Sequence, residues 1–402
     1  MLHFKSIVSK ININFKTLGK ILLLGVIIQI AFFLKYSYHS FNFLSGLLFL
    51  FVLWYLTFII VKHKSLKIKL IVNSIFISLL IIEILLRITG LNANYMEKRL
   101  GFYESAYHFA YPNYWIHRDM KEIQTPNQDY NFKRKFNSLG YSDKEWKWEA
   151  MKDKTRILAL GDSFTEGDGT HADSTWLKFL ERKINKSIYY FMNAGICGSD
   201  PVFELYKLKK PLKGFYPNIV IVCINQSDIQ DIIMRGGYER FTDKGVTFEK
   251  GPWWEPIYAM SHLSRLFFHI HYNKLLIPKK HYTKEINTSI ETINKTITEI
   301  ENFVSSHSAK LVVVFHPQKT EVKQNENPFK RLIKKQNQKG VYIIDLYDYY
   351  QTPEIKNNID DYYWIKDGHH NAKGYELMAE GIYQGLIELE LYHEDSSKNK
   401  TN

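Results

Sequence analysis

The pattern of apolar and polar positions changes near residue 90, where long apolar runs give way to short runs separated by polar stretches. Three long runs come before that point, at residues 21–34, 40–61 and 68–88. The second run contains no charged residue and is long enough to cross a bilayer core of about 30 Å. The third run is interrupted by Lys69, Glu83 and Arg87. We therefore predict that residues 1–90 form a membrane anchor with three transmembrane helices.

Glu83 and Arg87 are four residues apart and fall on one face of the predicted third helix. An acid inside a membrane often marks a functional site. A pair near the end of a helix also stabilises the point where the chain leaves the membrane. We prefer the second interpretation, because both residues lie near the distal end of the run.

Beyond residue 90 the pattern predicts a separate α/β domain. Residues 91–154 show no clear period and are expected to form a connecting layer. Short apolar runs then give five strand candidates, at residues 155–160, 188–193, 219–224, 310–316 and 341–346. Segments with a helical pattern fall at about residues 173–185, 202–212, 284–306, 326–338 and 372–390. This alternation is typical of a parallel sheet with helices on both faces. The predicted fold class is α/β: a three-layer α/β/α, flavodoxin-like domain over residues 155–392, with a mainly parallel sheet.

Two segments do not follow this alternation. Residues 240–283 are aromatic-rich and irregular, and we predict an insertion or a cap over one sheet edge. Trp253 and Trp254 in this segment could stack on sugar rings, although packing within the cap is the simpler interpretation. Residues 393–402 form a polar tail.

The formal net charge of +12 would suit a nucleic-acid partner, but its distribution favours a membrane. Lysines concentrate in the N-terminal tail and in the loop at residues 62–69, beside the apolar runs. Basic loops tend to stay in the cytoplasm, so three spans place everything after residue 90 on the other side. We expect a multi-pass protein of the cytoplasmic membrane, with its C-terminal domain extracytoplasmic and no nucleic-acid partner.

Polar residues and glycines follow several predicted strands, whose carboxyl ends meet at one edge of a parallel sheet. These segments are Gly161-Asp162-Ser163, Asn193-Ala-Gly-Ile-Cys-Gly198, Asn225-Gln-Ser-Asp228 and His316-Pro317, with Asp367-Gly-His-His-Asn371 ahead of the last helix. A serine becomes a strong nucleophile when a base takes its proton and an acid orients that base. Ser163 is therefore a candidate nucleophile, with Asp367 as the acid and His369 or His370 as the base.

The same edge offers donors for a developing oxyanion. Ser163 lies where a strand turns into a helix, so its backbone N–H and the helix dipole can face the negative charge. The backbone at Gly198 and a side chain of the 225–228 turn are further candidates.

These motifs resemble the blocks of the SGNH (GDSL-like) hydrolase superfamily, in the same order over residues 155–390. The matching residues are Gly161-Asp162-Ser163 for the first block, Asn193, Gly195 and Gly198 for the second, and Asp367-Gly-His-His-Asn-Ala-Lys-Gly374 for the last. In the family the catalytic histidine stands two residues before the last block's asparagine, which points to His369. A strict Asp-x-x-His pattern would point to His370, and we take His369. Two further motifs, Asn137-Ser-Leu-Gly-Tyr141 and Glu83-Ile-Leu-Leu-Arg87, resemble the membrane-anchored branch of the family.

One block departs from the family pattern. The family usually has Gly-x-Asn-Asp, whose asparagine amide is the third oxyanion donor. This chain reads Asn225-Gln-Ser-Asp-Ile229, with Ser227 at that position. Serine can still donate one hydrogen bond, and Asn225, two residues earlier on a strand, points to the same face. The expected oxyanion hole therefore consists of Ser163, Gly198 and either Ser227 or Asn225.

Other polar residues have less distinctive patterns. Glu166 and Asp168 are spaced for paired-carboxylate glycoside chemistry, but solvated loop acids are the simpler interpretation. His316-Pro317 is more readily strand-end geometry than a substrate contact. Cys197 and Cys223 lie in apolar segments, and two buried thiols are favoured over one bridge. The chain has no phosphate loop, metal-ligand spacing or dinucleotide fingerprint, so we expect no cofactor and no metal.

The motifs and the resemblance together imply a membrane-anchored serine esterase that forms a Ser-His-Asp acyl-enzyme. Its expected substrate is an acylated, for instance acetylated, glycan or lipid of the cell envelope. Two alternatives stay open from the sequence. One is an O-acyltransferase that passes the acyl group to a polysaccharide hydroxyl. The other is a non-catalytic glycan-binding scaffold, which the missing asparagine at position 227 would suit.

Overall fold

The computed structural model describes residues 20, 23, 24, 27, 43–91, 107–110, 114–117, 122–126, 129–209, 215–242, 245–246, 254, 257–258, 261–273 and 277–392. The chain divides into two compact units, and each is described by itself. Unit 1 holds Met1–Tyr103 and Lys250–Tyr282, and unit 2 holds Glu104–Glu249 and Thr283–Asn402.

Unit 2 is built on a five-stranded parallel sheet. Its strands are β5 (Thr155–Leu160), β6 (Tyr189–Asn193), β7 (Ile219–Ile224), β10 (Lys310–Phe315) and β11 (Tyr342–Asp345). The spatial order is β11-β10-β7-β5-β6. Counted from β5, this is the 2-1-3-4-5 order of flavodoxin-like sheets. The predicted α/β class with a parallel sheet is confirmed, and each of the five predicted strands lies in the sheet.

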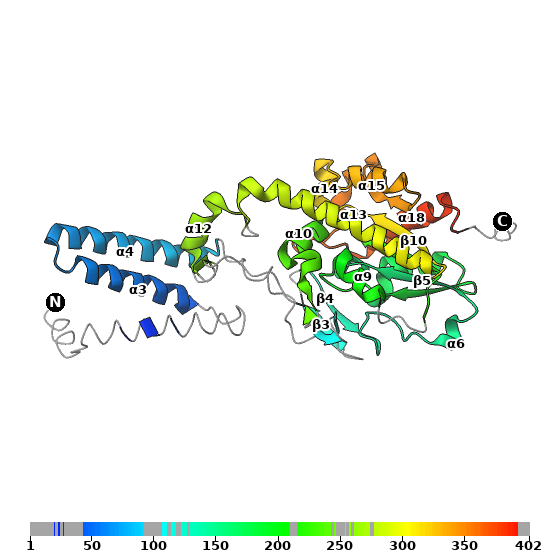
Figure 1. The fold of residues 1–402 in the computed structure, drawn as a ribbon, viewed down its shortest axis with the longest axis horizontal. Helices are drawn as coiled ribbons and strands as arrows, with labels where there is room; N and C mark the ends of the chain where they lie inside the picture. The colour runs from blue at the N-terminus through cyan, green and yellow to red at the C-terminus, as the bar shows by residue number, and fades with distance from the viewer. Residues whose placement is uncertain are drawn as a thin grey trace. The chain divides into compact units, whose positions relative to one another are not determined.

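Helices cover both faces of this sheet (Figure 1). On one face α8 (Trp176–Lys183) and α18 (Ala372–Glu388) pack against alternate strand residues such as Ile157, Ile221 and Val314. The intervening residues of each strand point the other way, toward the face where α9 (Pro201–Lys209) and α13 (Tyr282–Ser306) bury their apolar side chains. The remaining helices of this unit are α6 (Trp148–Met151), α7 (Ser163–Glu166), α10 (Gln226–Arg235), α14 (Lys319–Gln324), α15 (Lys330–Asn337), α16 (Leu346–Tyr350) and α17 (Pro353–Asn357).

The segment predicted as a connecting layer, in which the sequence shows no clear period, contains two antiparallel hairpins. Their strands are β1 (Tyr107–Ala110), β2 (Tyr114–His117), β3 (Glu122–Pro126) and β4 (Asn131–Lys135). A further short hairpin joins β8 (Phe241–Thr242) and β9 (Gly245–Val246). The strands are two to five residues long, so their sequences carry little alternation for a pattern to detect.

Unit 1 contains α3 (Phe43–Val61) and α4 (Leu66–Thr89), which pack side by side, and α12 (His262–His271), which packs on α4. Within the described residues, α4 is the one helix long and apolar enough to cross a membrane, by length and composition. The described side chains of α3 give a shorter apolar stretch, Leu50–Val61. The predicted first span at residues 21–34 lies outside the described residues, apart from three positions. Of the three predicted spans, the third one, which corresponds to α4, is therefore long and apolar enough in the described part of the chain.

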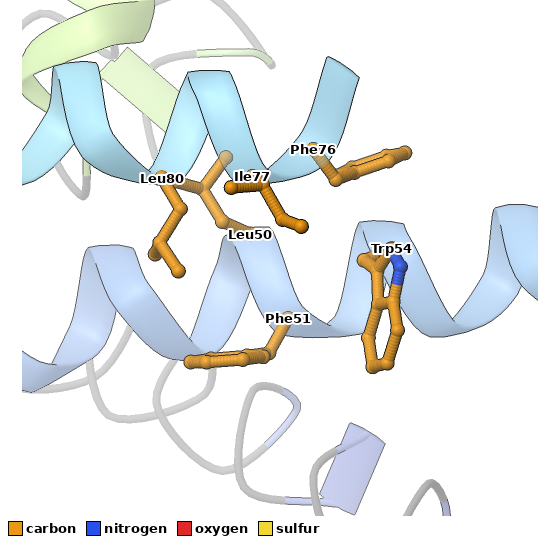
Figure 2. A pocket seen from close by; sticks show the side chains of 6 residues that line it. All are labelled: Leu50, Phe51, Trp54, Phe76, Ile77 and Leu80. Carbon is orange, nitrogen blue, oxygen red and sulfur yellow. The ribbon is translucent and has the colours of Figure 1, made fainter. Parts of the chain in front are cut away.

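An apolar cavity of about 200 Å³ lies between α3 and α4 (Figure 2). It is lined by Leu50, Phe51, Trp54, Phe76, Ile77 and Leu80. The indole N–H of Trp54 donates to Asn73 Oδ1 at 2.8 Å, so the polar atom of the lining is satisfied. None of the residues predicted to act chemically lines this cavity.

The segment 240–283, predicted as an insertion or cap, is divided between the units, with Lys250–Tyr282 in unit 1. Trp254 is 8% exposed, and its ring stacks on Phe268 with the centroids 4.1 Å apart. Packing, rather than stacking on a sugar, is thus what the structure shows for Trp254. Trp253 lies outside the described residues.

Candidate active site

Ser163 is presented by a sharp turn at the end of β5, the strand next to which the order of the sheet reverses. Gly161 has a φ of 153°, and a Cβ atom there would lie 2.1 Å from Thr165 Oγ1, so a larger residue would not fit. Asp162 caps the following turn by accepting the N–H of Phe164 at 2.9 Å. The helix that Ser163 begins, α7, is four residues long and ends at Gly167. The helix dipole expected from the sequence is therefore that of a single turn. Stabilisation of an oxyanion would depend more on the individual backbone N–H groups of this turn.

Ser163, His369 and Asp367 form a chain of hydrogen bonds. Ser163 Oγ lies 2.7 Å from His369 Nε2, and His369 Nδ1 lies 2.5 Å from Asp367 Oδ1. The serine comes from the turn after β5, and the other two come from the loop ahead of α18. The structure thus brings Ser163 together with two residues that lie more than 200 positions later in the sequence.

The start of α18 holds this loop in place. Asn371 caps the helix by accepting the N–H of Gly374 at 3.1 Å. A Cβ atom on Gly374 would lie 2.0 Å from the carbonyl oxygen of Tyr362 and 2.4 Å from His370 Nδ1. The Asn-x-x-Gly pattern is therefore required by a helix that begins directly against the loop.

His370 has different surroundings from His369. It is fully buried, and its ring nitrogens lie 3.2 Å from the Tyr350 hydroxyl and 3.1 Å from the carbonyl oxygen of Tyr362. Burial, with a smaller effect of His316, lowers the pKa of His370 to about 3. A histidine with that pKa stays neutral and, in this position, has a packing role.

The electrostatics of His369 set a pH dependence for any reaction that needs it as a base. Burial alone would lower its pKa, but the hydrogen bond to Asp367 and the charges of Asp168, Asp367 and Asp162 raise it above 6.5. A base must be unprotonated, so kcat/KM is expected to fall as pH drops through a midpoint above 6.5. Asp367→Asn, which removes the nearest negative charge, should move that midpoint to lower pH. The measurement is kcat/KM for a neutral ester against pH, with Asp173→Asn on the surface as control, and a wild-type midpoint below 6.5 would contradict it.

Asp162 accepts hydrogen bonds from two polar side chains at the end of β7. Asn225 Nδ2 donates to Asp162 Oδ2 at 2.9 Å, and Ser227 Oγ lies 3.0 Å from the same oxygen. Asn225 is fully buried and also caps α10, with Asp228 completing the capping box. The two predicted alternatives for the third oxyanion donor are both bonded to the carboxylate beside Ser163. These contacts support the turn that presents the serine.

The loop after β6 is fastened to the same turn. The side chain of Asn193 donates to the carbonyl of Thr165 at 2.8 Å, and the carbonyl of Gly161 accepts from Ile196 N at 3.0 Å and Ser199 Oγ at 2.8 Å. Gly198, between those two donors, has a φ of 70°. The backbone N–H groups of Ser163 and Gly198 have no acceptor among the described residues.

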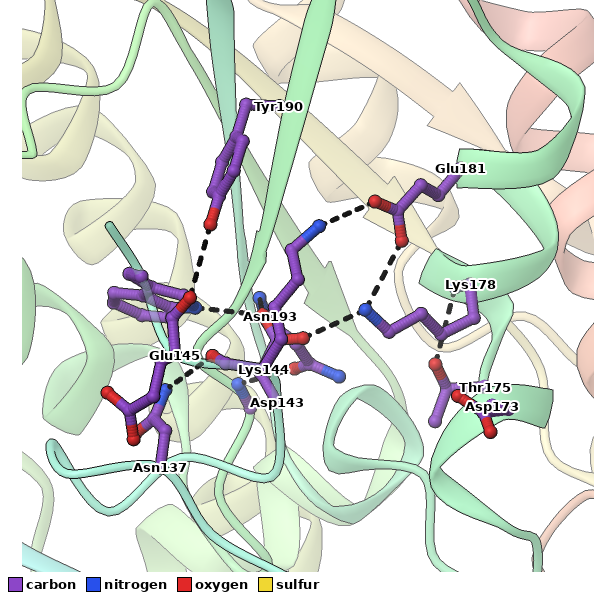
Figure 3. A network of polar contacts seen from close by, with 12 residues as sticks. Asn137, Asp143, Lys144, Glu145, Asp173, Thr175, Lys178, Glu181, Tyr190 and Asn193 are labelled. Atoms are coloured by element: carbon purple, nitrogen blue, oxygen red, sulfur yellow. Dashed lines mark hydrogen bonds and ion pairs between the residues drawn. The ribbon is translucent and has the colours of Figure 1, made fainter. Parts of the chain in front are cut away.

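The Asn137-Ser-Leu-Gly-Tyr141 motif forms a tight turn that positions the loop after β6. Asn137 Oδ1 accepts the N–H groups of Leu139 and Tyr141 at 3.0 Å each. Two residues later, Asp143 accepts the N–H of Asn193 at 2.8 Å and also binds Lys178 of α8 at 2.9 Å (Figure 3). Asp143, which follows this motif and donates its N–H to the carbonyl of Tyr141, thus contacts the second block through Asn193.

Glu166 and Asp168 are not solvated loop acids, as the sequence had suggested, but partners of a buried arginine. Arg134 on β4 is 2% exposed, and its Nη1 lies 2.9 Å from Glu166 Oε1 and 2.6 Å from Asp168 Oδ1. Its other terminal nitrogen donates to the carbonyl of Gly167 at 2.6 Å. The two carboxylates share one guanidinium, which offsets one of their two negative charges, and Glu166 also accepts the backbone N–H of Cys197. This arrangement suits a structural role for them.

Sequence reasoning missed Asp129 and Tyr130, which hold the loop that carries Asp367. Asp129 Oδ2 accepts the successive N–H groups of Lys366 at 2.6 Å and Asp367 at 2.9 Å. Burial and the charges of Asp168 and Asp367 raise the pKa of Tyr130, so its hydroxyl stays protonated and can donate to Asp367. The segment around them has no periodic pattern, and no signal in the sequence places it beside residues more than 200 positions away.

Aromatic rings form a row beside this loop. The ring centroid of Tyr130 lies 5.7 Å from Trp364 and 5.5 Å from Phe132, and Phe132 lies 4.5 Å from His171. Tyr130, Phe132 and Trp364 are each partly exposed. We call Trp364, Tyr130, Phe132 and His171 the aromatic row.

His316 and the two thiols lie outside the hydrogen-bond chain of Ser163, His369 and Asp367, although the backbone N–H of Cys197 donates to Glu166 Oε2 at 2.5 Å. His316 is fully buried against Phe164, with ring centroids 5.0 Å apart, and burial lowers its pKa to about 4. Cys223 is buried and Cys197 is partly buried, and both are free thiols, as the apolar segments had suggested. Among the described residues, no three His, Cys, Asp or Glu side chains are grouped to hold a metal ion.

Comparisons with known proteins give structural matches alone: no family model and no curated protein matches the chain. A protein described as lipolytic and of the G-D-S-L family, from Desulfitobacterium hafniense DCB-2, is 15% identical, with 58% of this chain and 100% of that chain covered and a TM-score of 0.37. The acetyl xylan esterase AlAXEase is 13% identical, with 58% and 100% covered and a TM-score of 0.38. The esterase EstA from Pseudoalteromonas sp. is 13% identical, with 60% and 100% covered and a TM-score of 0.37. Similarity at this level assigns neither a family nor an activity to the chain.

Proposed function

We propose that the protein is a serine esterase of the SGNH type, with Ser163 as nucleophile, His369 as base and Asp367 as the acid that orients it. The observation that carries this proposal is the hydrogen-bond chain from Ser163 Oγ through His369 to Asp367. For the second requirement, a place for negative charge, we assign the backbone N–H groups of Ser163 and Gly198, which have no acceptor among the described residues.

The reaction proceeds in two halves. Ser163 Oγ attacks the acyl carbonyl carbon while its proton passes to His369 Nε2, and Asp367 stabilises the imidazolium. The intermediate collapses when His369 returns the proton to the departing alcohol, which leaves the acyl group on Ser163. A water molecule then attacks this ester with His369 taking its proton, and the carboxylic acid leaves as the proton returns to Ser163 Oγ.

In this mechanism the oxyanion is held by the N–H groups of Ser163 and Gly198. Each such donor contributes roughly 3–4 kcal/mol to stabilising the transition state. Asn225 and Ser227 act on the serine indirectly, because both bind the Asp162 carboxylate that caps its turn. The serine at position 227 is thereby compatible with hydrolysis.

For the substrate we propose an acylated glycan of the cell envelope. Rings of the aromatic row are partly exposed next to the loop of Asp367, and an aromatic face binds the C–H face of a sugar ring. The proposed location agrees with this class. With α4 crossing the membrane and the Lys-rich loop at residues 62–69 in the cytoplasm, unit 2 follows on the extracytoplasmic side.

The glycan proposal predicts a selective effect of Phe132→Ala. Losing one stacking ring should raise KM for an acetylated oligosaccharide about three- to tenfold, equivalent to roughly 0.7–1.4 kcal/mol. The value of kcat/KM for p-nitrophenyl acetate should stay unchanged, because that substrate does not reach the row. Phe179→Ala on α8 is the matched control. Equal losses on both substrates would mean that Phe132 supports the fold instead of binding sugar.

The esterase proposal is tested with a fluorophosphonate probe, which reacts with an activated serine. Wild-type protein in detergent should label rapidly, and Ser163→Ala should not label. Equal, slow labelling of the two proteins would show that the site is not catalytic and would favour a binding scaffold. The wild-type enzyme, not treated with the probe, is then incubated with a radiolabelled acetyl donor, with and without glycan. Release of free acetate measures hydrolysis, and radioactivity on the glycan measures transfer.

A further inference from the structure

Glu83 of α4 is fully buried and has four described partners, although most residues of α4 are apolar. Arg87 donates to it at 2.6 Å from the same helix. Ser261 Oγ and the backbone N–H groups of His262 and Leu263 donate to it at 2.9, 3.1 and 2.8 Å. The carboxylate therefore binds the free N–H groups at the start of α12 and locks the two helices together.

The surface of α12 has two faces. On one, Phe268 packs against Trp254, with the rings parallel within 8°. On the other, Leu263 is buried, and Leu266, Phe267 and Ile270 are 48%, 59% and 62% exposed. At 100° per residue these four fall within about 100° of arc. We call them the α12 stripe, and three of its four large apolar side chains have no cover in the described part of the chain.

We propose that the α12 stripe lies in the surface of the lipid bilayer that α4 crosses. The inference rests on the proposed membrane anchor and goes beyond it, since it assigns a membrane contact to a segment almost 180 positions later in the chain. Short helices with one apolar face bind in this way at the boundary between headgroups and acyl chains.

The position along α4 of the hydrogen bonds between Glu83 and the start of α12 supports a location of α12 at the bilayer surface. Glu83 lies six residues before the end of α4 at Thr89, which corresponds to about 9 Å along the helix. The first turn of α12 is therefore held within about two turns of the end of the apolar helix, where a bilayer interface is expected. The exposed apolar surface of α4, including Ile81, Leu85 and Ile88, reaches the same end of unit 1.

The charges that follow α12 fit the same surface. Lys279, Lys280 and His281 form one exposed turn a few residues after the helix. Lysines beside an interfacial amphipathic helix add electrostatic attraction to anionic lipid headgroups. In a bilayer that contains anionic lipid, the α12 stripe would contact the acyl chains and the basic turn would contact the headgroups.

The test uses the full chain reconstituted in vesicles of phosphatidylcholine and phosphatidylglycerol. Phe267→Cys is labelled with the environment-sensitive fluorophore NBD, and quenching by lipids with a nitroxide high on the acyl chain is measured. Ile81→Cys on α4 reports the anchor, and Lys335→Cys on α15 is the soluble control. Wild-type protein treated in parallel corrects for Cys197 and Cys223.

Quenching at positions 267 and 81, with little at position 335, is the expected result. If position 81 is quenched and position 267 is quenched no more than position 335, the inference is overturned while the anchor stands. If position 81 is not quenched, the anchor fails and this inference fails with it. The esterase proposal is separate from both, because the probe reaction at Ser163 is measured in detergent.

Discussion

His369→Ala is expected to lower kcat roughly 10,000-fold or more on any ester that the wild-type protein hydrolyses. His369 Nε2 lies 2.7 Å from Ser163 Oγ and is the described base within reach of that proton. Without it the serine stays protonated through the attack, and the leaving alcohol has no acid. The measurement is kcat under saturating substrate, with binding followed separately by a non-hydrolysed analogue.

His370→Gln is the matched control for this prediction, because the two histidines are adjacent and the sequence alone allowed either. Glutamine can keep hydrogen bonds to the Tyr350 hydroxyl and the Tyr362 carbonyl. We expect this variant to lose some stability but to keep most of its kcat. If His370→Gln were the inactive variant and His369→Ala the active one, the assignment of the base would be wrong.

Arg134→Met is expected to reduce the free energy of unfolding by about 3–5 kcal/mol, although Arg134 makes no contact with Ser163. The substitution keeps much of the side-chain volume but leaves Glu166, which is 1% exposed, and Asp168 without their shared cation. An unpaired buried carboxylate is costly, whereas the intact cluster is satisfied. Urea unfolding of the full chain in detergent, followed by tryptophan fluorescence, measures the loss.

The comparison for Arg134 is Arg182→Met, which removes an exposed arginine bonded to a backbone carbonyl. A change within about 0.5 kcal/mol is expected there. The triple variant that adds Glu166→Gln and Asp168→Asn should regain part of the stability, because it removes the unpaired charges. A loss below about 1 kcal/mol for Arg134→Met would mean that water reaches the two carboxylates.

The chemistry at the sheet edge was predictable because parallel strands bring distant residues together by a simple rule. Once β5 was recognised from its apolar run, Ser163 had to lie at the carboxyl edge, and the polar loop ahead of α18 was expected at the same edge. Helix α10 was missed because its first turn, Gln226-Ser-Asp228, resembles a loop. Its capping box, formed by Asn225 and Asp228, is a sequence signal for a helix start within the segment that the resemblance assigns to the oxyanion hole.

The supports of the site were not predictable in this way. Asp129, Arg134 and Asp143 lie in a segment without period, and each acts through backbone groups or charges on other elements. Nothing local in their sequence specifies those partners, which are fixed by how the hairpins and turns of this segment pack. The family pattern leaves the third oxyanion donor open between Ser227 and Asn225, whereas in the structure both side chains contact the Asp162 carboxylate.

The carbonyl of Gly161 has a consequence for the proposed reaction. It accepts hydrogen bonds from both Ile196 and Ser199, on either side of Gly198, and it belongs to the turn that carries Ser163. The N–H groups of Ser163 and Gly198, which we assign to the oxyanion, therefore belong to two segments that are joined by hydrogen bonds. Charge that develops on the acyl oxygen would meet dipoles already oriented by folding, so little of the activation free energy would go into reorienting them. The enzyme would then select substrates by how well they fit a preorganised oxyanion hole. An induced rearrangement of these N–H groups would not be needed.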